Sequence, residues 1–214
     1  MEKRKTEISN TQGVIDERKL LRILGVVDIS PRVKARSNPV EPIVTLSSAG
    51  KDLDELVEAL KEHAGLMKKY SVKLYYIFVL QLNSGARISE VLGIKPNDIM
   101  ANGNVRLRGK KGSDNRIITG GEATEYLLKC RSTLTYPFSD YNRKFIWSIY
   151  KKFGIEIEVN TSGKKAVTHS LRHIMVNSAR QIGIENKETA KYIGHKNESN
   201  TKNYGNTKKE NRAT

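Results

Sequence analysis

The sequence feature that most constrains the fold is an apolar stretch, SVKLYYIFVLQLNSG (residues 71–85), in which hydrophobic side chains occupy nearly every face of a helix. A helix of this kind has to be buried on all sides. The stretch is shorter than the roughly 18 residues needed to span a bilayer, and it stops at the turn-forming sequence Asn83-Ser84-Gly85. We therefore expect a helix in the centre of a protein core.

Amphipathic segments on both sides of this stretch predict the helices that surround it. The first, KDLDELVEALKEHAG (51–65), carries leucines at helical spacing, and His63 is expected to be a solvated residue at its end. A short helix should open at Ala86 and close by Gly93. Further helices are expected at about 121–134, 139–153, 168–182 and 186–194, followed by a short polar tail.

One β-hairpin is expected among these helices. Residues 104–108 (NVRLR) and 115–119 (NRIIT) alternate apolar and polar side chains on either side of GKKGSD. This pattern is typical of two antiparallel strands joined by an exposed, basic tip. Residues 160–165 are expected to form only a short connection. The predicted fold class is mainly α with a small antiparallel β-sheet (α+β).

The charge of the chain points to a polyanionic partner. Its 38 basic and 23 acidic residues give a net charge of +15. The excess lies at the two ends and in the segment from residue 100 onward, whereas residues 40–99 carry 7 basic and 8 acidic residues. Charge alone does not distinguish a DNA enzyme from a basic protein that binds ribosomal RNA.

The cysteine count and the N-terminus bear on the compartment. Cys130 is the single cysteine, so an internal disulfide is excluded, and no pair of Cys-x-x-Cys motifs is present to hold zinc. The N-terminal sequence MEKRKTEISN has no apolar segment behind it, and no apolar run is long enough to span a bilayer. We expect an intracellular, cytoplasmic protein without a membrane partner.

Six side chains could together carry out phosphoryl transfer without a metal, which needs cations for the phosphate, a proton donor and a nucleophile. Each is weak evidence alone, because a hairpin lysine or a tyrosine near a chain end is usually just exposed. The candidates are Arg87, Lys111, His169, Arg172, His195 and Tyr204.

A second histidine on the same helix raises the question of a metal. His173 follows His169 by four residues, but the segment lacks the glutamate of the HExxH motif, so a zinc peptidase is not predicted. We assign His173 to helix packing or to a hydrogen bond that supports the site. No metal ligands are predicted.

Three motifs and their spacing give these candidates a common meaning. SGARISEVLGI resembles the first arginine box of the tyrosine recombinase (phage integrase and Xer-type) family, THSLRH its His-x-x-Arg box, and IGHKNESNTKNY its Gly-His box. Tyr204 follows His195 by 9 residues, His195 follows His169 by 26, and Lys111 follows Arg87 by 24, as in the family. The resemblance covers about residues 45–206.

The resemblance implies the tyrosine recombinase catalytic-domain fold for residues 45–206. Residues 1–44 would form an N-terminal helix and a basic linker, and residues 207–214 a C-terminal tail.

The resemblance also implies a role for each candidate. Tyr204 would attack the scissile phosphate to give a 3′-phosphotyrosine and a free 5′-hydroxyl, while Arg87 and Arg172 hold the non-bridging oxygens. Lys111 would protonate the departing 5′-oxygen, although Lys110 could take its place because hairpin register is poorly fixed by sequence. His169 and His195 would hydrogen-bond the phosphate or assist the proton of Tyr204. No cofactor is implied, and no Walker-type loop is present.

The implied substrate is double-stranded DNA, bound mostly through its backbone, with self-assembly into a dimer or tetramer on it. The reaction would serve DNA integration and excision, or inversion, in a mobile genetic element. A type IB topoisomerase with similar residues and a non-catalytic DNA-binding accessory protein are the alternatives. Further DNA contacts are expected from Arg108, Lys110, Arg116, Lys164 and Lys165.

Overall fold

The computed structural model describes residues 53–110, 113–155, 157–158 and 165–202. The helix and linker expected within residues 1–44, the tail at 207–214, and the side chains of Lys111, Lys164 and Tyr204 lie outside the described residues. Eight α-helices are described: α2 (Leu53–Tyr70), α3 (Val72–Ser84), α4 (Ile88–Val91), α5 (Thr124–Ser132), α6 (Arg143–Lys152), α7 (Ser170–Gln181), α8 (Asn186–Ile193) and α9 (Ser199–Lys202). Two 3₁₀ turns, η2 (Pro96–Asp98) and η3 (Gly121–Ala123), accompany four short strands, β1 (Val105–Leu107), β2 (Arg116–Ile118), β3 (Ile157–Glu158) and β4 (Lys165–Ala166).

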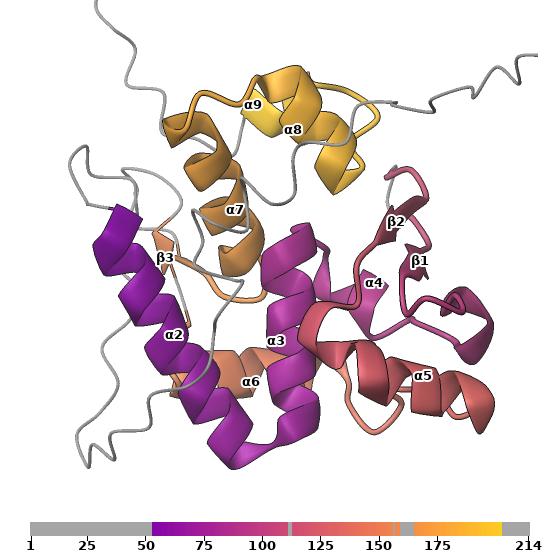
Figure 1. The fold of residues 1–214 in the computed structure, drawn as a ribbon. Coiled ribbons are helices and arrows are strands. Elements are labelled where there is room, and N and C mark those ends of the chain that lie inside the picture. The colour runs from indigo at the N-terminus through magenta and orange to yellow at the C-terminus, as the bar shows by residue number, and fades with distance from the viewer. Residues whose placement is uncertain (1–52, 111–112, 156, 159–164, 203–214) are drawn as a thin grey trace, which may run out of the picture.

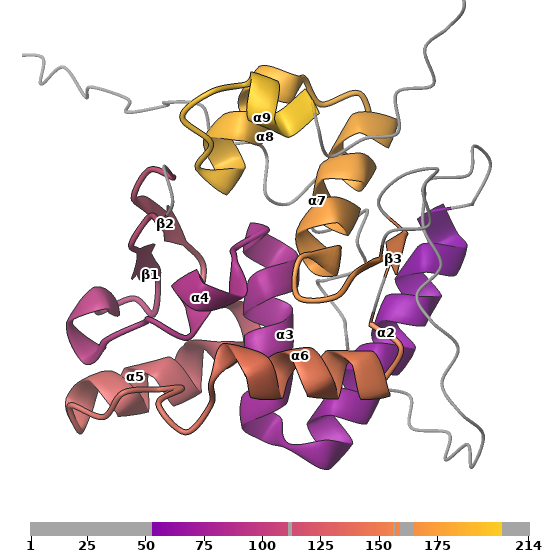
Figure 2. The ribbon, with the colours of Figure 1, turned by 180° about the vertical axis from the view of Figure 1, so that it is seen from behind.

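Helix α3 forms the centre of the core, as its all-round apolar sequence predicts (Figure 1). It packs against α2, α4, α7 and η3. Seen from behind, α6 crosses it (Figure 2), and the rings of Phe78 and Tyr150 meet edge to face with their centroids 6.3 Å apart. The helix begins after Ser71, whose Oγ accepts a hydrogen bond from Leu74 N at 3.5 Å. Burial on every side, rather than amphipathic packing on one face, holds α3 in place.

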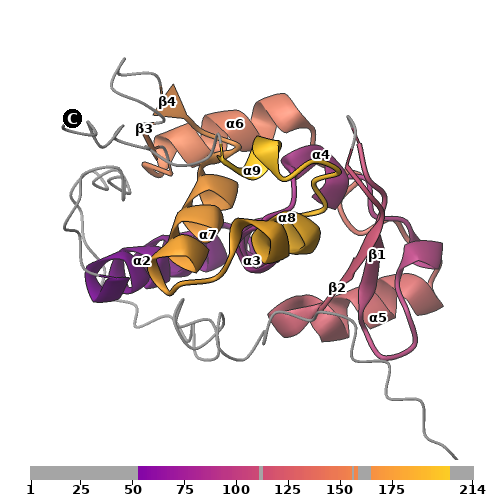
Figure 3. The same ribbon diagram turned by 90° about the horizontal axis from the view of Figure 1, so that it is seen from above.

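The predicted hairpin is present and lies beside α5 (Figure 3). β1 and β2 pair antiparallel, with Val105 opposite Ile118 and Leu107 opposite Arg116. Alternate residues face inward, so Val105 and Ile118 are buried whereas Ile117 is 57% exposed. The hairpin tip extends from this small sheet toward the layer formed by α8 and α9 (Figure 1).

Helices α8 and α9, together with α7, form a layer above α3 (Figure 1). α7 is buried along most of its length, and its expected range of 168–182 is close to the observed one. α8 ends at Gly194, which adopts a left-handed conformation with φ 73°. At this position a Cβ would approach the side chain of Arg116 to 3.0 Å and the carbonyl of Asp114 to 3.1 Å. A glycine here therefore lets the end of α8 pack closely against the hairpin.

The structure corrects the prediction for His63, which is 2% exposed rather than solvated. Gly65 does not end the helix, because α2 continues to Tyr70. His63 therefore lies on the same helical face as the buried Leu60, Ala64 and Met67, and its Nδ1 lies 2.5 Å from the carbonyl of Ala59.

Three further details differ from the sequence expectation. α6 begins at Arg143, with Asn142 as its N-cap accepting from Phe145 N at 2.9 Å, and not near residue 139. An antiparallel strand pair that was not predicted, β3–β4, lies at the two ends of the expected connection. A last short helix, α9, stands where a polar tail was expected. Within the described ranges, no helix is both long enough and apolar enough to cross a membrane.

Candidate active site

The turn after α3 brings the first two motifs into contact. Gly85 ends α3 with φ 57°, and a Cβ there would overlap the side chains of Met175 on α7 and Ile193 on α8. Only glycine fits this left-handed, crowded position. Its carbonyl accepts a hydrogen bond from Arg172 NH1 at 2.6 Å, while Arg172 NH2 donates to the carbonyl of Ile193 at 3.1 Å. The arginine of the second motif thus joins the end of α3 to the end of α8.

Arg172 has no exposed surface. The planar guanidinium can serve two carbonyls that face it from different elements, which the single ammonium of lysine cannot do with the same geometry. The acceptors of both hydrogen bonds are neutral carbonyls, so these two contacts do not cancel the positive charge of Arg172.

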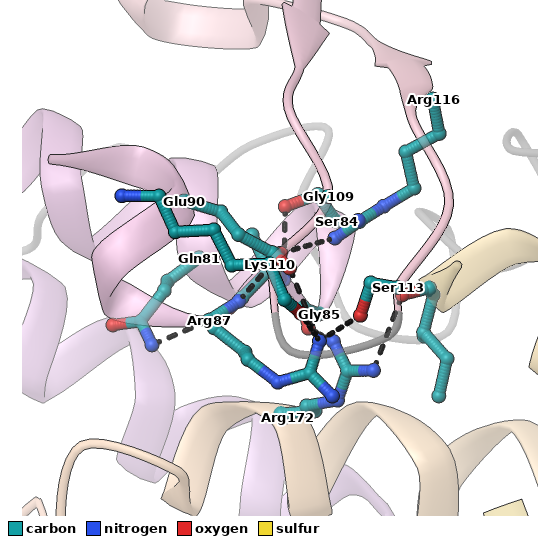
Figure 4. Close-up of polar contacts among 12 residues, drawn as sticks. Gln81, Ser84, Gly85, Arg87, Glu90, Gly109, Lys110, Ser113, Arg116 and Arg172 are labelled. Carbon is teal, nitrogen blue, oxygen red and sulfur yellow. Dashed lines mark hydrogen bonds and ion pairs between the residues drawn. The ribbon is translucent and has the colours of Figure 1, made fainter. Parts of the chain in front are cut away.

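Arg87 is held by a carboxylate and by the hairpin tip (Figure 4). Its NH1 forms an ion pair with Glu90 Oε1 at 3.1 Å and donates hydrogen bonds to the carbonyl of Lys110 at 3.3 Å and to the Ser113 hydroxyl. The backbone N–H of Arg87 also donates to Glu90 Oε2 at 3.0 Å. The side chain is 16% exposed. Arg87 therefore stands at the start of α4 with its guanidinium partly open to solvent.

Glu90 is the buried carboxylate of this cluster, with a side chain that has no exposed surface. Burial alone would raise its pKa, but Arg116 and the backbone N–H of Arg87 more than offset this, so the pKa lies below its usual value. Arg116 NH2 forms the second ion pair with it, at 3.0 Å. Glu90 thus forms ion pairs with two arginines, Arg87 and Arg116, from separate parts of the chain.

Arg116, one of the DNA contacts expected from the sequence, lies mostly inside the protein. Its side chain is 8% exposed. Inward-facing positions alternate along β2, and Arg116 shares its side of the strand with the buried Ile118, while Ile117 faces outward. The strand period therefore turns Arg116 toward Glu90 and away from the surface (Figure 4).

The third motif meets the hairpin through the backbone. Ser113 and His195 form an isolated antiparallel bridge, and Asp114 N donates to the carbonyl of Gly194 at 3.0 Å. Because the Ser113 hydroxyl also contacts Arg87, this one residue links the first motif to the third. Ser113 itself is 8% exposed.

His195 lies beside these arginines and is 8% exposed. Its pKa is lowered to about 4, first by burial and then by the positive charges of Arg172, Arg87 and Arg116, which Glu90 offsets only in part. The imidazole is therefore neutral at neutral pH. Its Nδ1 lies 2.8 Å from the hydroxyl of Thr201 on α9.

A buried amide that the sequence analysis did not single out ties the first two motifs together. Gln81 Nε2 donates to the carbonyls of Ala86, at 3.2 Å, and Thr168, at 2.9 Å, which stand directly before Arg87 and His169. Its Oε1 accepts from the Tyr150 hydroxyl at 2.9 Å. A lone glutamine in an otherwise apolar helix was the available signal, since a buried amide has to find hydrogen-bond partners.

The remaining candidates take less central places. His169 is the residue before α7, where its carbonyl accepts from His173 N at 3.0 Å. His173 is 9% exposed. Arg108 is exposed but forms an ion pair with the buried Asp98 at 2.8 Å. Lys165 lies in β4.

Lys110 is exposed, and its Nζ donates to the carbonyl of Ser89 at 2.9 Å. The side chain extends away from the guanidinium groups of Arg87 and Arg172 (Figure 4). Lys110 therefore does not point its ammonium at the two arginines. The side chain of Lys111 lies outside the described residues.

A cavity opens next to His195. Its lining holds more basic than acidic side chains and comes from the hairpin, α8 and the segment after α8: Asp114, Asn115, Arg116, Lys187, Ala190, Lys191, His195, Lys196 and Glu198. Three of these lysines were not among the sequence candidates. In the described part of the chain, no group of three or more histidine, cysteine, aspartate or glutamate side chains could hold a metal ion. The chemistry that this arrangement favours is the binding of a phosphate by cations and a neutral imidazole.

Comparisons with known proteins agree with this geometry. The sequence profile of the phage integrase family matches residues 49–211. The chain is 25% identical over 148 residues to the tyrosine recombinase XerA of Thermococcus onnurineus, covering 60% of this chain and 49% of that protein. It is also 25% identical over 192 residues to the tyrosine recombinase XerD of Corynebacterium glutamicum, covering 83% of this chain and 60% of that protein. The chain thus spans about half to three fifths of the length of these relatives.

A solved structure shows the same fold. The crystal structure of the XerA recombinase matches with a TM-score of 0.52 and 24% sequence identity, over 70% of this chain and 58% of that chain. The predicted fold class, mainly α with small antiparallel sheets in the arrangement of a tyrosine recombinase catalytic domain, is confirmed.

Proposed function

This chain belongs to the phage integrase family, and we propose that it is a site-specific DNA recombinase that cuts and rejoins strands through a 3′-phosphotyrosine on Tyr204. Residues 45–206 would be its catalytic domain. The observation that carries the proposal is the meeting of Arg87, Arg172 and His195, which come from three separate motifs, around one partly open site.

The charge of the site supports a phosphate ligand. Among the described residues, Glu90 forms ion pairs with Arg87 and Arg116, and the charge of Arg172 also acts on it, so positive charge is in excess around this carboxylate in a place with little solvent. Charges in such a place act more strongly than they do in water. A non-bridging phosphate oxygen would neutralise the excess and would find guanidinium donors already positioned.

The proposed reaction is a transesterification that conserves the energy of the phosphodiester bond. The Tyr204 hydroxyl gives its proton to His169, its oxygen forms a bond to phosphorus, and the bond from phosphorus to the 5′-oxygen breaks. Arg87 and Arg172 stabilise the charge on the non-bridging oxygens. Lys111 gives a proton to the departing 5′-oxygen and takes it back when the 5′-hydroxyl attacks the phosphotyrosine. Neither ATP nor a metal is required for this balance.

The proposal includes double-stranded DNA as the substrate, with the chain assembling on it as a dimer or tetramer inside the cell. The basic cavity beside His195 offers lysines that can contact the DNA backbone next to the scissile phosphate. Integration, excision and inversion use the same chemistry, so the site is compatible with each.

Trapping the covalent intermediate tests the proposal. The full chain is incubated with nicked duplex fragments prepared from the genome that encodes it, because loss of the short strand beyond the nick prevents religation. We expect an adduct that survives detergent, with the DNA attached through its 3′-phosphate to the peptide that contains Tyr204, as identified by mass spectrometry.

The control is Tyr204→Phe, which removes only the hydroxyl nucleophile. This variant should bind the same fragments in a mobility-shift assay and form no adduct. An adduct on the Tyr204→Phe protein, attachment at another residue, or no adduct with the unaltered chain would overturn the proposal.

A further inference from the structure

We infer that Thr201 is a positioning residue for His195: its hydroxyl fixes the imidazole in the tautomer that carries its hydrogen on Nε2. The catalytic meaning of this contact rests on the proposed function. The contact itself is a property of the free protein and can be tested without DNA.

The geometry places the two side chains in a direct, buried contact. Thr201 Oγ1 lies 2.8 Å from His195 Nδ1, Thr201 has no exposed surface, and His195 is 8% exposed. A hydrogen bond at this distance fixes the ring plane as well as the identity of the nitrogen that takes part. Water has little access to compete for either group.

Counting hydrogens assigns the direction of the bond. Within the described residues, Nδ1 of His195 is the hydrogen-bond partner of the Thr201 hydroxyl. If Nδ1 carried a hydrogen, the hydroxyl would have to accept it, and its own hydrogen would be buried without an acceptor. If instead the hydroxyl donates to Nδ1, the Thr201 hydrogen and the Nδ1 lone pair satisfy each other, and a neutral imidazole then carries its hydrogen on Nε2.

The surroundings favour the neutral ring that this count requires. The charged groups that act most on His195 are Arg172 from α7, Arg87 and Glu90 from the N-cap and first turn of α4, and Arg116 from the hairpin. Lys187 and Lys191 of α8, Lys196 and Glu198 after it, and Asp114 of the hairpin line the same cavity. The net effect of the charges that act most on His195 is positive, and together with burial it disfavours the imidazolium.

Arg180 holds Thr201 in place from the other side. Its NH2 donates to the carbonyl of Thr201 at 2.6 Å, and its Nε donates to Asn186 Oδ1 at 2.9 Å. The last turn of α7 is therefore tied both to the start of α8 and to α9. Thr201 N also donates to the carbonyl of Glu198 at 2.8 Å. These contacts fix the backbone of Thr201, and with it the position from which the hydroxyl reaches the ring.

The sequence leaves two roles open for His195: a hydrogen bond to the phosphate, or assistance with the proton of Tyr204. The tautomer with its hydrogen on Nε2 allows only the first. An imidazole whose Nδ1 accepts from Thr201 offers an N–H on Nε2, which can donate to a phosphate oxygen. It has no free nitrogen lone pair with which to take the proton of Tyr204. Thr201 thus makes His195 a hydrogen-bond donor to the phosphate.

The tautomer can be observed directly by long-range ¹H–¹⁵N NMR of the full chain at pH 7, with the His195 signals identified by their loss in His195→Asn. We expect the Nε2–H pattern in the unaltered chain. Thr201→Val keeps the shape of the side chain but removes the hydroxyl, so a mixture of the two tautomers should appear. Thr201→Ser keeps the hydroxyl and should keep the Nε2–H pattern.

Thr189→Val is the matched control. Thr189 is a fully buried threonine on α8 whose hydroxyl has no hydrogen-bond partner among the described residues. This variant should leave both the tautomer and the rate unchanged. A difference between the two valine variants therefore reports the hydroxyl and not the general effect of altering a buried threonine.

Single-turnover adduct formation at saturating protein gives the functional readout. Removing the Thr201 hydroxyl that orients the His195 imidazole should reduce the rate of adduct formation by about 10- to 100-fold in Thr201→Val, with DNA affinity unchanged. Thr201→Ser should restore the rate. An Nδ1–H pattern in the unaltered chain, or an unchanged tautomer in Thr201→Val, would overturn the inference. If the tautomers behave as expected but the unaltered chain forms no adduct, the proposed function fails and the hydrogen-bond assignment stands.

Discussion

The buried, neutral state of His195 predicts a specific loss of stability in mild acid. Its pKa in the folded protein is about 4, below the ordinary value of 6.5. As the pH falls from 7, the unfolded chain binds a proton at His195 well before the folded chain does. The free energy of unfolding must therefore fall with pH, because stability decreases wherever the unfolded state binds more protons.

The size of the effect follows from the two pKa values. Linkage between a pKa of 6.5 unfolded and about 4 folded gives a loss of about 2 kcal/mol between pH 7 and pH 5, and about 3 kcal/mol by pH 4. The largest cause is burial, so the loss should persist in high salt better than a surface charge effect would. Glu90 has a pKa below its usual value and contributes mainly below this window.

The assay compares the unaltered chain with His195→Asn by urea unfolding at pH 7, 6 and 5. Asparagine does not titrate and can still accept a hydrogen bond from Thr201. The single tryptophan, Trp147 on α6, and far-UV circular dichroism report the transition. We expect the difference in free energy of unfolding between the two proteins to change by about 2 kcal/mol over this range. Parallel pH dependences for the two proteins would refute the placement of His195 in a buried, positively charged site.

Three further changes test other parts of the site. Glu90→Gln removes a buried carboxylate that is bound to two arginines and should cost about 3–5 kcal/mol in urea unfolding, whereas Asp140→Asn breaks an exposed ion pair and should cost at most about 1 kcal/mol. Arg172→Lys should reduce both stability and adduct formation, because one ammonium cannot bond both carbonyls that the guanidinium joins; near-normal values in both assays would contradict this. Lys111→Ala should cleave an ordinary phosphodiester slowly but recover on a bridging 5′-phosphorothiolate, while Lys110→Ala should lose DNA affinity only, and rescue of Lys110→Ala instead would exchange their roles.

The elements with strong local patterns were predictable from the sequence. The all-round apolar stretch that became α3, the alternating strands of the hairpin, and the amphipathic ranges of α7 and α8 depend on burial periods that are visible in a single chain. The site motifs were predictable for another reason, since a fixed order and spacing of reactive residues is recognisable before any fold is known. The roles of Tyr204 and Lys111 stay predictions.

The errors arose where tertiary packing outweighs local pattern. Gly65 resembles a helix end, but α2 runs through it because its apolar face continues to Met67 in the core. Arg116 resembles an exposed hairpin cation until the strand period and the position of Glu90 are combined, and that position depends on the fold. Thr201 could not be connected to His195 from the sequence, because the contact requires the chain to turn back into α9.

The choice of partners for the arginines explains how the site can hold a phosphate. Arg172 is fully buried, and its NH1 and NH2 donate to two carbonyls, which bond the guanidinium without neutralising its charge. Arg87 and Arg116 share one carboxylate instead of having one each. If every arginine had its own carboxylate, the free site would be neutral and an incoming phosphate would have to displace an ion pair, with the penalty of leaving a buried charge unpaired. Hydrogen bonds to carbonyls carry no such penalty, and the shared carboxylate of Glu90 leaves positive charge in excess over these contacts for the anion that the family motifs lead us to expect there.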